Sequence, residues 1–211
     1  MVRGKSKPMR SRISAGLLMF RRRNHEIEVL LVHPGGPFFV RKDDGAWTIP
    51  KGEAATGEDL LTRAQIEFEE EVGFRPENVH RWIELGWIQQ KGGKIVHAWA
   101  FEGDLLEPFE CKSNLFELEW PPRSGKYQSF PEVDQACFFS DEGARRKLKA
   151  TQLPFLDRLR AALTNEARRI AGDVVSGRET AAIRDFVSSS HRGEQEKRAT
   201  KCAEDQAHSP E

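Results

Sequence analysis

The chain has 211 residues, and its 33 basic and 33 acidic side chains balance to a formal net charge of zero. This length accommodates one ordinary globular domain with appendages, and the balanced charge excludes binding to nucleic acid through bulk positive charge. The three cysteines, Cys111, Cys137 and Cys202, lie far apart and lack the spacing of a zinc site or a disulfide framework, which favours a reducing, cytoplasmic location.

Residues 1–13 form a basic N-terminal arm, because no acidic side chain occurs before Glu26. We expect a solubilising tail here, and contact with RNA or phosphate is the alternative. The apolar run Ala15–Phe20 is too short for the core of a signal peptide, and no segment approaches the length of a membrane span. No membrane partner is therefore expected.

The region between residues 14 and 163 has the patterns of a domain that mixes strands and helices. Short apolar runs predict strands at residues 14–20, 27–33, 82–90, 94–103, 115–120 and 135–140. Helical periodicity predicts helices at residues 58–72, 141–150 and 153–163. This order predicts an α/β fold with a mixed sheet and helices on its faces, in which Trp82 and Trp87 belong to the core. The Pro-rich segment from Pro121 to Pro131 is predicted to be a loop.

Beyond about Thr164 the hydrophobic content of the chain falls. The segment from Ser188 to the end is polar enough to remain disordered. We therefore predict three parts, namely an arm at residues 1–13, a domain at residues 14–163 and a polar, partly disordered extension at residues 164–211.

The helix predicted at residues 58–72 carries its acidic side chains beside an apolar stripe. The stripe consists of Leu60, Leu61, Ala64, Phe68 and Val72. Glu67, Glu70 and Glu71 stand at positions i, i+3 and i+4, where like charges repel by roughly 0.2–0.5 kcal/mol per pair. A hard divalent cation, Mg²⁺ or Mn²⁺, would stabilise such a carboxylate cluster and leave ligand positions open for water and phosphate. A solvated helix face is the alternative.

The spacing around this helix is specific. From Gly52, five residues lead to Glu58, seven more follow, and then come Ile66, Glu67, Phe68, Glu70, Glu71, Gly73 and Phe74. This order resembles the signature of the Nudix hydrolase family, and "WTIPKG" from Trp47 to Gly52 commonly precedes it. One position differs, because Ile66 stands where the signature has arginine, with Arg63 the nearest basic residue before it. The resemblance implies a Nudix-type α/β/α sandwich with a mixed central sheet over residues 14–163.

The resemblance also implies a metal site. Glu67, Glu70 and Glu71 would bind the catalytic Mg²⁺ or Mn²⁺ ions, the backbone carbonyl of Gly52 or Lys51 would assist them, and Glu58 would support the metal-bound waters. The general base would be Glu67 or a glutamate outside the motif, for which Glu117, Glu119 and Glu132 are the candidates.

The implied reaction is the attack of water on a phosphorus of a nucleoside diphosphate linked to another moiety, with metal ions neutralising the phosphate oxygens. Clustered carboxylates titrate as a group, so activity should need metal and favour alkaline pH. Ile66 permits two interpretations: a weaker but working hydrolase, or a nucleotide-binding module with weak or no turnover.

The run "GAWTIPKGE" is similar to the diadenosine tetraphosphate hydrolases and the nucleoside triphosphate pyrophosphohydrolases of the family. Lys51, Arg41 and Lys42 could meet the charge of a polyphosphate, and Phe39 and Trp47 could stack a purine. The hypothesis is therefore a small-molecule nucleotide substrate, with a dinucleoside polyphosphate ahead of a nucleoside triphosphate. RNA with a 5′ triphosphate stays an alternative because of the basic arm. The oligomeric state is left open.

Overall fold

The computed structural model describes residues 13–24, 26–105, 109 and 111–175. The predicted basic arm, apart from Ile13, and the extension after Val175 lie outside the described residues.

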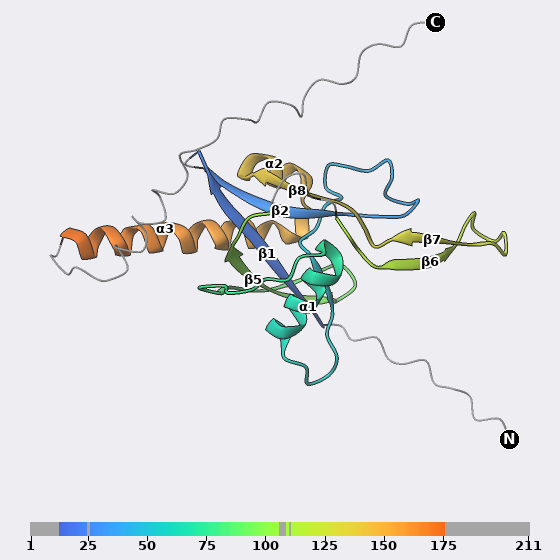
Figure 1. Cartoon of the computed structure of the whole chain (residues 1–211), viewed down its shortest axis with the longest axis horizontal. Helices are drawn as coiled ribbons and strands as arrows, with labels where there is room; N and C mark the ends of the chain where they lie inside the picture. Colours follow the sequence, from blue (N-terminus) through green and yellow to red (C-terminus); the bar gives the residue numbers. More distant parts are fainter. Residues whose placement is uncertain (1–12, 25, 106–108, 110, 176–211) are drawn as a thin grey trace, which may run out of the picture. The chain divides into compact units, whose positions relative to one another are not determined.

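A six-stranded sheet forms the centre of the domain (Figure 1). Its strands are β1 (Ile13–Arg23), β2 (Glu26–Pro34), β3 (Lys51–Glu53), β4 (Ile83–Gln89), β5 (Ile95–Glu102) and β8 (Val133–Ser140). They are arranged in the order β4-β5-β1-β2-β8, and β3 pairs with β1. Strands β1 and β5 are parallel, whereas the other pairs are antiparallel. The predicted mixed sheet is confirmed.

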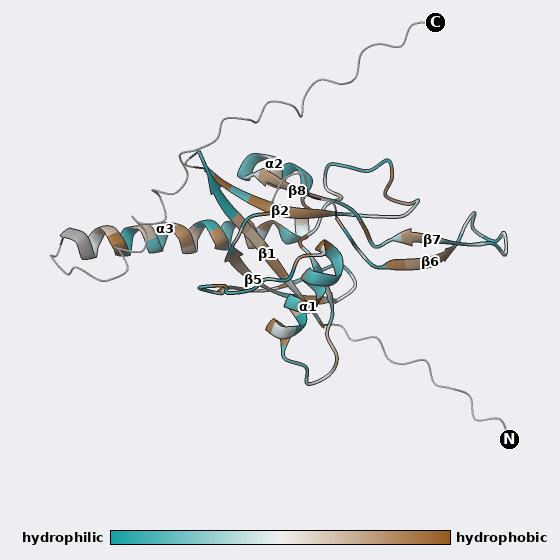
Figure 2. Cartoon of the chain, in the orientation of Figure 1, coloured by the Kyte–Doolittle hydropathy of each residue, from teal (hydrophilic) through white to brown (hydrophobic). Residues whose placement is uncertain are grey.

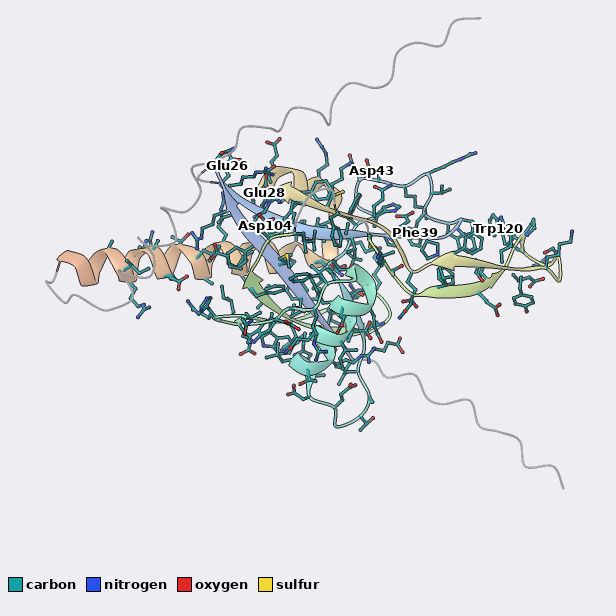
Figure 3. All side chains as sticks on the ribbon, viewed as in Figure 1. Glu26, Glu28, Phe39, Asp43, Asp104 and Trp120 are labelled. Atoms are coloured by element: carbon teal, nitrogen blue, oxygen red, sulfur yellow. The ribbon has the colours of Figure 1, made fainter. Side chains whose placement is uncertain are left out.

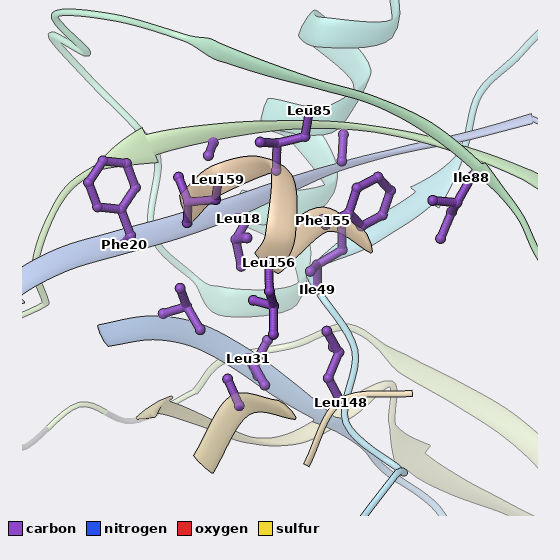
Figure 4. Packing of buried hydrophobic residues seen from close by; sticks show 14 of the residues in the cluster. Leu18, Phe20, Leu31, Ile49, Leu85, Ile88, Leu148, Phe155, Leu156 and Leu159 are labelled. Carbon is purple, nitrogen blue, oxygen red and sulfur yellow. The ribbon is translucent and has the colours of Figure 1, made fainter. Parts of the chain in front are cut away.

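Both faces of the sheet are covered. Successive side chains of a strand point to opposite faces, so a strand in such a sheet is apolar at consecutive positions. Helix α1 (Leu60–Val72) packs on the face that contains Leu17 and Met19 of β1. On the other face lie Leu18 and Phe20, together with α2 (Asp141–Lys147), the short 3₁₀ turn Ala150–Gln152 and the first turns of α3 (Leu153–Val175). Figure 4 shows this second core from close by. The α/β/α sandwich is therefore confirmed.

Helix α1 has clear signals at both ends. Asp59 caps its start, because its carboxylate accepts a hydrogen bond of 2.8 Å from the backbone N–H of Thr62. Gly73 ends it in the left-handed conformation with a φ of 78°, and its N–H donates to the carbonyl of Glu69. Between these caps, the apolar stripe of the helix buries Ala64, Phe68 and Val72 against the sheet. The side chain of Glu67 is buried with them, and this fixes where its carboxylate lies.

One predicted loop contains a strand. Strands β6 (Leu115–Glu119) and β7 (Tyr127–Pro131) form a separate hairpin, so the Pro-rich segment is not a loop throughout. Arg123 and Gly125 adopt positive φ values in its turn. The rings of Phe116 and Phe130 lie opposite each other on the two strands, with 6.1 Å between their centres. Figure 2 shows the apolar residues of this hairpin, which projects from the main sheet.

The prediction for Trp87 is wrong, because 55% of this residue is exposed. An irregularity in the pairing of β4 between Glu84 and Gly86 changes which face the following residues occupy. Trp82, by contrast, packs against the ring of Phe101 at 5.3 Å and joins the core beneath α1.

Helix α3 continues past residue 163, where the sequence places the end of the domain, and reaches Val175. The domain boundary thus stays a prediction. Among the described residues, no helix combines the length and the apolar character that a membrane crossing requires.

Candidate functional site

The three glutamates of α1 lie where the helix meets β3. Strand β3 pairs with β1, so that Gly52 lies opposite Ala15. Ala15 belongs to the hydrophobic core that lies beneath α1. The backbone N–H of Lys51 donates to the carboxylate of Glu71 at 3.1 Å. Glu67 is 8% exposed, whereas 39% of the side chain of Glu70 is exposed. The predicted cluster therefore faces the backbone of the predicted residues Lys51 and Gly52.

Gly52 is in close contact with the buried carboxylate of Glu67. A Cβ atom at position 52 would overlap all three atoms of that carboxylate group. The absence of a side chain at Gly52 thus lets the Glu67 carboxylate lie against the backbone of β3. Carboxylate and carbonyl oxygens are the ligands that Mg²⁺ and Mn²⁺ prefer, so these residues fit the cation that the sequence implies.

Arg63 supplies the positive charge at this cluster. Its Nη2 atom donates to Oε1 of Glu67, one helical turn away, and to Oε2 of Glu70 at 3.2 Å. Burial opposes the charge on the guanidinium, but the two glutamates raise the pKa of Arg63 above its ordinary value. In the part of the chain described by the structure, no three His, Cys, Asp or Glu side chains are gathered in a metal-binding arrangement, and the guanidinium lies on two of the carboxylates.

Ile66, which stands at the signature position for arginine, takes no part in these contacts and is 36% exposed. Arg63 and Ile66 differ by three positions, so both lie on neighbouring parts of the helix surface. The spacing of i and i+4 between Arg63 and Glu67 could have indicated the ion pair from the sequence alone.

Burial changes the acidity of the cluster. It raises the pKa of Glu71 to about 7 and also raises the pKa of Glu67. The charge of Glu132 contributes to both shifts. Glu119, in contrast, accepts a hydrogen bond of 2.8 Å from the N–H of Gly125 in the hairpin turn. Glu132 is therefore a candidate base outside the motif that the fold brings to the glutamates of α1, whereas Glu119 is held in the hairpin turn.

The raised pKa of Glu71 predicts a pH-dependent stability for protein kept free of divalent cations by a chelator. Between the ordinary value of 4.5 and about 7, the folded protein keeps a proton on Glu71 that the unfolded chain has released. The free energy of unfolding should therefore fall as the pH rises through this window, by roughly 3 kcal/mol from this group. Urea unfolding at about pH 5 and about pH 8 should show this fall in the wild type and a smaller one in Glu71→Gln. Equal falls in both proteins would contradict the assignment.

The predicted substrate residues fall into two groups. Lys51 lies close enough to Glu71 for its charge to lower the pKa of that carboxyl, and Lys42 places its Nζ atom 5.0 Å from the centre of the Phe39 ring. Arg41 and Trp47, together with Lys42, line a cavity of about 470 Å³ between the 40–43 segment, β8 and α2. Figure 3 shows that Phe39 lies at the opposite end of the sheet from Asp104.

Trp47 is 4% exposed. Its Nε1 atom donates to Asp43 at 2.9 Å, and its ring packs edge to face against Phe139 at 4.9 Å. These contacts are those of a core side chain that borders the cavity. Contact with a purine would require the base to enter that cavity.

Glu58 and His33 stabilise the backbone near the site. Glu58 accepts a hydrogen bond of 2.7 Å from the N–H of Ala55, in the turn before α1. His33 is buried, and its two ring nitrogens lie 2.7 Å from the carboxylate of Asp134 and 2.7 Å from the carbonyl of Lys42. His33 thereby fixes the segment that presents Lys42.

Comparisons with known proteins identify the family of the chain. The family profile described as NUDIX domain matches residues 10–159. A search of curated proteins gave no match. Among solved structures, a C. elegans Ap4A hydrolase in a binary complex matches with a TM-score of 0.53 and 21% identity, covering 72% of this chain and 98% of that chain. The NUDIX domain of Shewanella oneidensis NrtR, complexed with ADP ribose, matches with a TM-score of 0.51 and 14% identity, covering 75% of this chain and 91% of that chain.

At these identities the two solved structures show the similarity of the fold alone. The NUDIX profile, however, extends over more than half of the chain and includes the whole glutamate motif. The chain therefore belongs to the Nudix family of hydrolases, enzymes that cleave pyrophosphate bonds.

Proposed function

We propose that this Nudix hydrolase is a metal-dependent pyrophosphohydrolase that acts on a nucleoside polyphosphate, with a dinucleoside polyphosphate as the preferred class. The observation that carries the proposal is the contact between the glutamates of α1 and the backbone of β3, which leaves Gly52 against the buried carboxylate of Glu67. The lysines beside this cluster suit an extended phosphate chain. The C. elegans protein of similar fold is an Ap4A hydrolase, which agrees with this class.

Glu67, Glu70, Glu71 and the carbonyl of Gly52 or Lys51 would hold Mg²⁺ or Mn²⁺, with Glu58 in support. When bound, such a cation neutralises phosphate charge and makes the attacking water more acidic.

The remaining chemistry belongs to side chains of the chain. Glu132, which neighbours Glu67 and Glu71, would accept the proton of the attacking water on its carboxylate. Lys51 would bind a phosphate oxygen through its ammonium group. Arg63 would hold Glu67 and Glu70 in orientation.

The alternative is a nucleotide-binding module, and Ile66 is the observation that favours it. The ion pairs of Arg63 with Glu67 and Glu70 weaken this alternative, because the guanidinium of Arg63 orients the glutamates although the signature arginine is missing. An RNA substrate would depend on the basic arm, which lies outside the described residues.

The test is product release from a panel that contains a dinucleoside tetraphosphate, a nucleoside triphosphate, ADP-ribose and 5′-triphosphorylated RNA. Each substrate is supplied with Mg²⁺, Mn²⁺ or a chelator. We expect the dinucleoside tetraphosphate to give the highest kcat/KM and the chelator to abolish turnover. A complete lack of turnover, combined with a nucleotide-dependent rise in Tm, would instead establish the binding module.

A second prediction concerns Arg63 and Ile66. Arg63→Gln should lower kcat roughly tenfold to a hundredfold, because removing a side chain that orients a metal ligand has effects of that size. Ile66→Arg should change kcat less than about twofold, since Arg63 already provides the orienting charge. The double variant should recover part of the loss, because an arginine at position 66 lies next to Glu67 and one turn before Glu70.

Steady-state kinetics and the Mg²⁺ concentration for half-maximal rate distinguish these outcomes. A large gain from Ile66→Arg alone would show that Arg63 does not orient the cluster in solution. Unchanged kinetics in Arg63→Gln would lead to the same conclusion.

A further inference from the structure

Lys149 lies beside the candidate site although it is far from the glutamate motif in sequence. It follows α2, where Leu148 forms an isolated bridge with Trp47. The backbone N–H of Lys149 donates to the carbonyl of Trp47 at 2.9 Å. These backbone contacts fix Lys149 against the segment that leads into Lys51 and Gly52, so its position is defined by the fold.

The ammonium group of Lys149 joins two others. Its Nζ atom lies 5.6 Å from the centre of the Phe39 ring, on which Lys42 also places its ammonium group at 5.0 Å. The charges of Lys51, Lys42 and Glu71 all act on Lys149. Lys42 and Lys149, from two separate segments, therefore share the Phe39 ring, and Lys51 and Glu71 lie close enough for their charges to act on Lys149.

The three lysines have no anionic group in direct contact with their ammonium groups among the described residues. Among the described residues, the ammonium groups of Lys42, Lys51 and Lys149 make no hydrogen bond and no ion pair within 4.0 Å, and Phe39 offers only the face or edge of a ring. Burial lowers the pKa of Lys149, and the neighbouring lysines lower it further. Lys147, two residues earlier, provides a contrast because Asp43 and Asp44 both pair with it.

An anion bound among the three lysines would relieve both the repulsion and the cost of burial. The phosphate groups of the proposed substrate are such anions, and Glu71, one of the proposed metal ligands, acts on Lys149 through its charge. A phosphate chain that is longer than a diphosphate would extend from the glutamates toward Phe39 and reach Lys149.

We propose that Lys149 binds a phosphate group next to those held at the glutamates, and that it gives the site its preference for longer phosphate chains. Lys149 is then a substrate-binding residue that determines specificity. This inference rests on the proposed function for its substrate, but the binding of a polyphosphate can be measured without any turnover.

The test compares Lys149→Met and Lys149→Arg in the full chain, with Lys94→Met as the matched control. Lys94 is a partly buried lysine whose ammonium group is paired with Glu53 at 3.2 Å, in the turn between β4 and β5. Calorimetry with Mg²⁺ present measures the affinity for inorganic tripolyphosphate and for pyrophosphate. Lys149→Met should weaken tripolyphosphate binding about tenfold and pyrophosphate binding less than threefold, whereas Lys149→Arg and Lys94→Met should stay within about twofold of the wild type.

Kinetics supply the second readout. Lys149→Met should raise KM for a dinucleoside tetraphosphate about tenfold, with little change in kcat and little change in either constant for ADP-ribose. Unchanged tripolyphosphate affinity in a Lys149→Met protein that melts like the wild type would overturn the inference. So would an equal loss of affinity in Lys94→Met. If the wild type turns over no substrate, the proposed hydrolase fails, and a selective loss of tripolyphosphate binding in Lys149→Met would still support the phosphate site.

Discussion

The Glu70→Gln variant is expected to lose at least about a hundredfold in kcat with Mg²⁺ while keeping the fold of the wild type. A bound cation contributes several kcal/mol to catalysis, and each 1.36 kcal/mol corresponds to a factor of about ten in rate. Removing the charge of Glu70 deprives the cation of one ligand and deprives Arg63 of one partner. Because the side chain of Glu70 is 39% exposed, its replacement by the isosteric amide should shift Tm little.

Glu69→Gln is the matched control for this experiment. Glu69 is the preceding residue of the same helix, its side chain is 47% exposed, and its carboxylate lies 3.8 Å from Arg75 at the helix end. The control removes the same charge from α1 and should leave kcat within about twofold. An unchanged rate in Glu70→Gln would remove Glu70 from the metal site. Equal losses in the two variants would indicate a general electrostatic effect of the helix.

The Gly52→Ala variant is expected to lose about a hundredfold in kcat and to need more Mg²⁺ for half-maximal rate. The added methyl group would occupy the position of the Glu67 carboxylate. The carboxylate is the far end of a flexible side chain, so it can move away at a modest cost to the fold. Its displacement would break the pair with Arg63 and take one ligand away from the cation.

Gly172→Ala tests whether the loss is specific to position 52. A Cβ atom at Gly172 meets nothing within 4 Å, and alanine favours a helix, so this variant should keep full activity. Metal titrations followed by activity and by Tm distinguish the two variants. A Gly52→Ala protein with wild-type turnover and wild-type Mg²⁺ dependence would show that Glu67 does not bind the cation.

The sequence by itself determined the helix, the motif and the family. These features depend on short spacings along the chain. Glu67, Glu70 and Glu71 share a flank because a helix has 3.6 residues per turn, and the caps and the apolar stripe define where α1 begins, ends and packs. Short apolar runs likewise predicted β1 and β2, and the order of strands and helices predicted the mixed sheet.

Two features of the fold, strand β3 and the exposure of Trp87, could not be predicted from the sequence, each for a local reason. Strand β3 has three residues, which is too short for a period of two to be recognised. The pairing irregularity in β4 places Trp87 on the surface, and such irregularities have no marker in hydrophobic pattern alone.

Only the tertiary structure decided which charges surround the glutamates. The sequence offered three candidate bases, and the chain leading from the hairpin into β8 brings Glu132 to the cluster. Lys149 reaches Lys42 and Lys51 because the backbone of the segment after α2 bonds to that of Trp47. Contacts between residues so far apart in the chain leave no periodic pattern, since they are produced by sheet pairing and core packing rather than by the geometry of one helix or strand. For that reason the sequence predicted where a cation would bind, and the packed fold determined which side chains surround it.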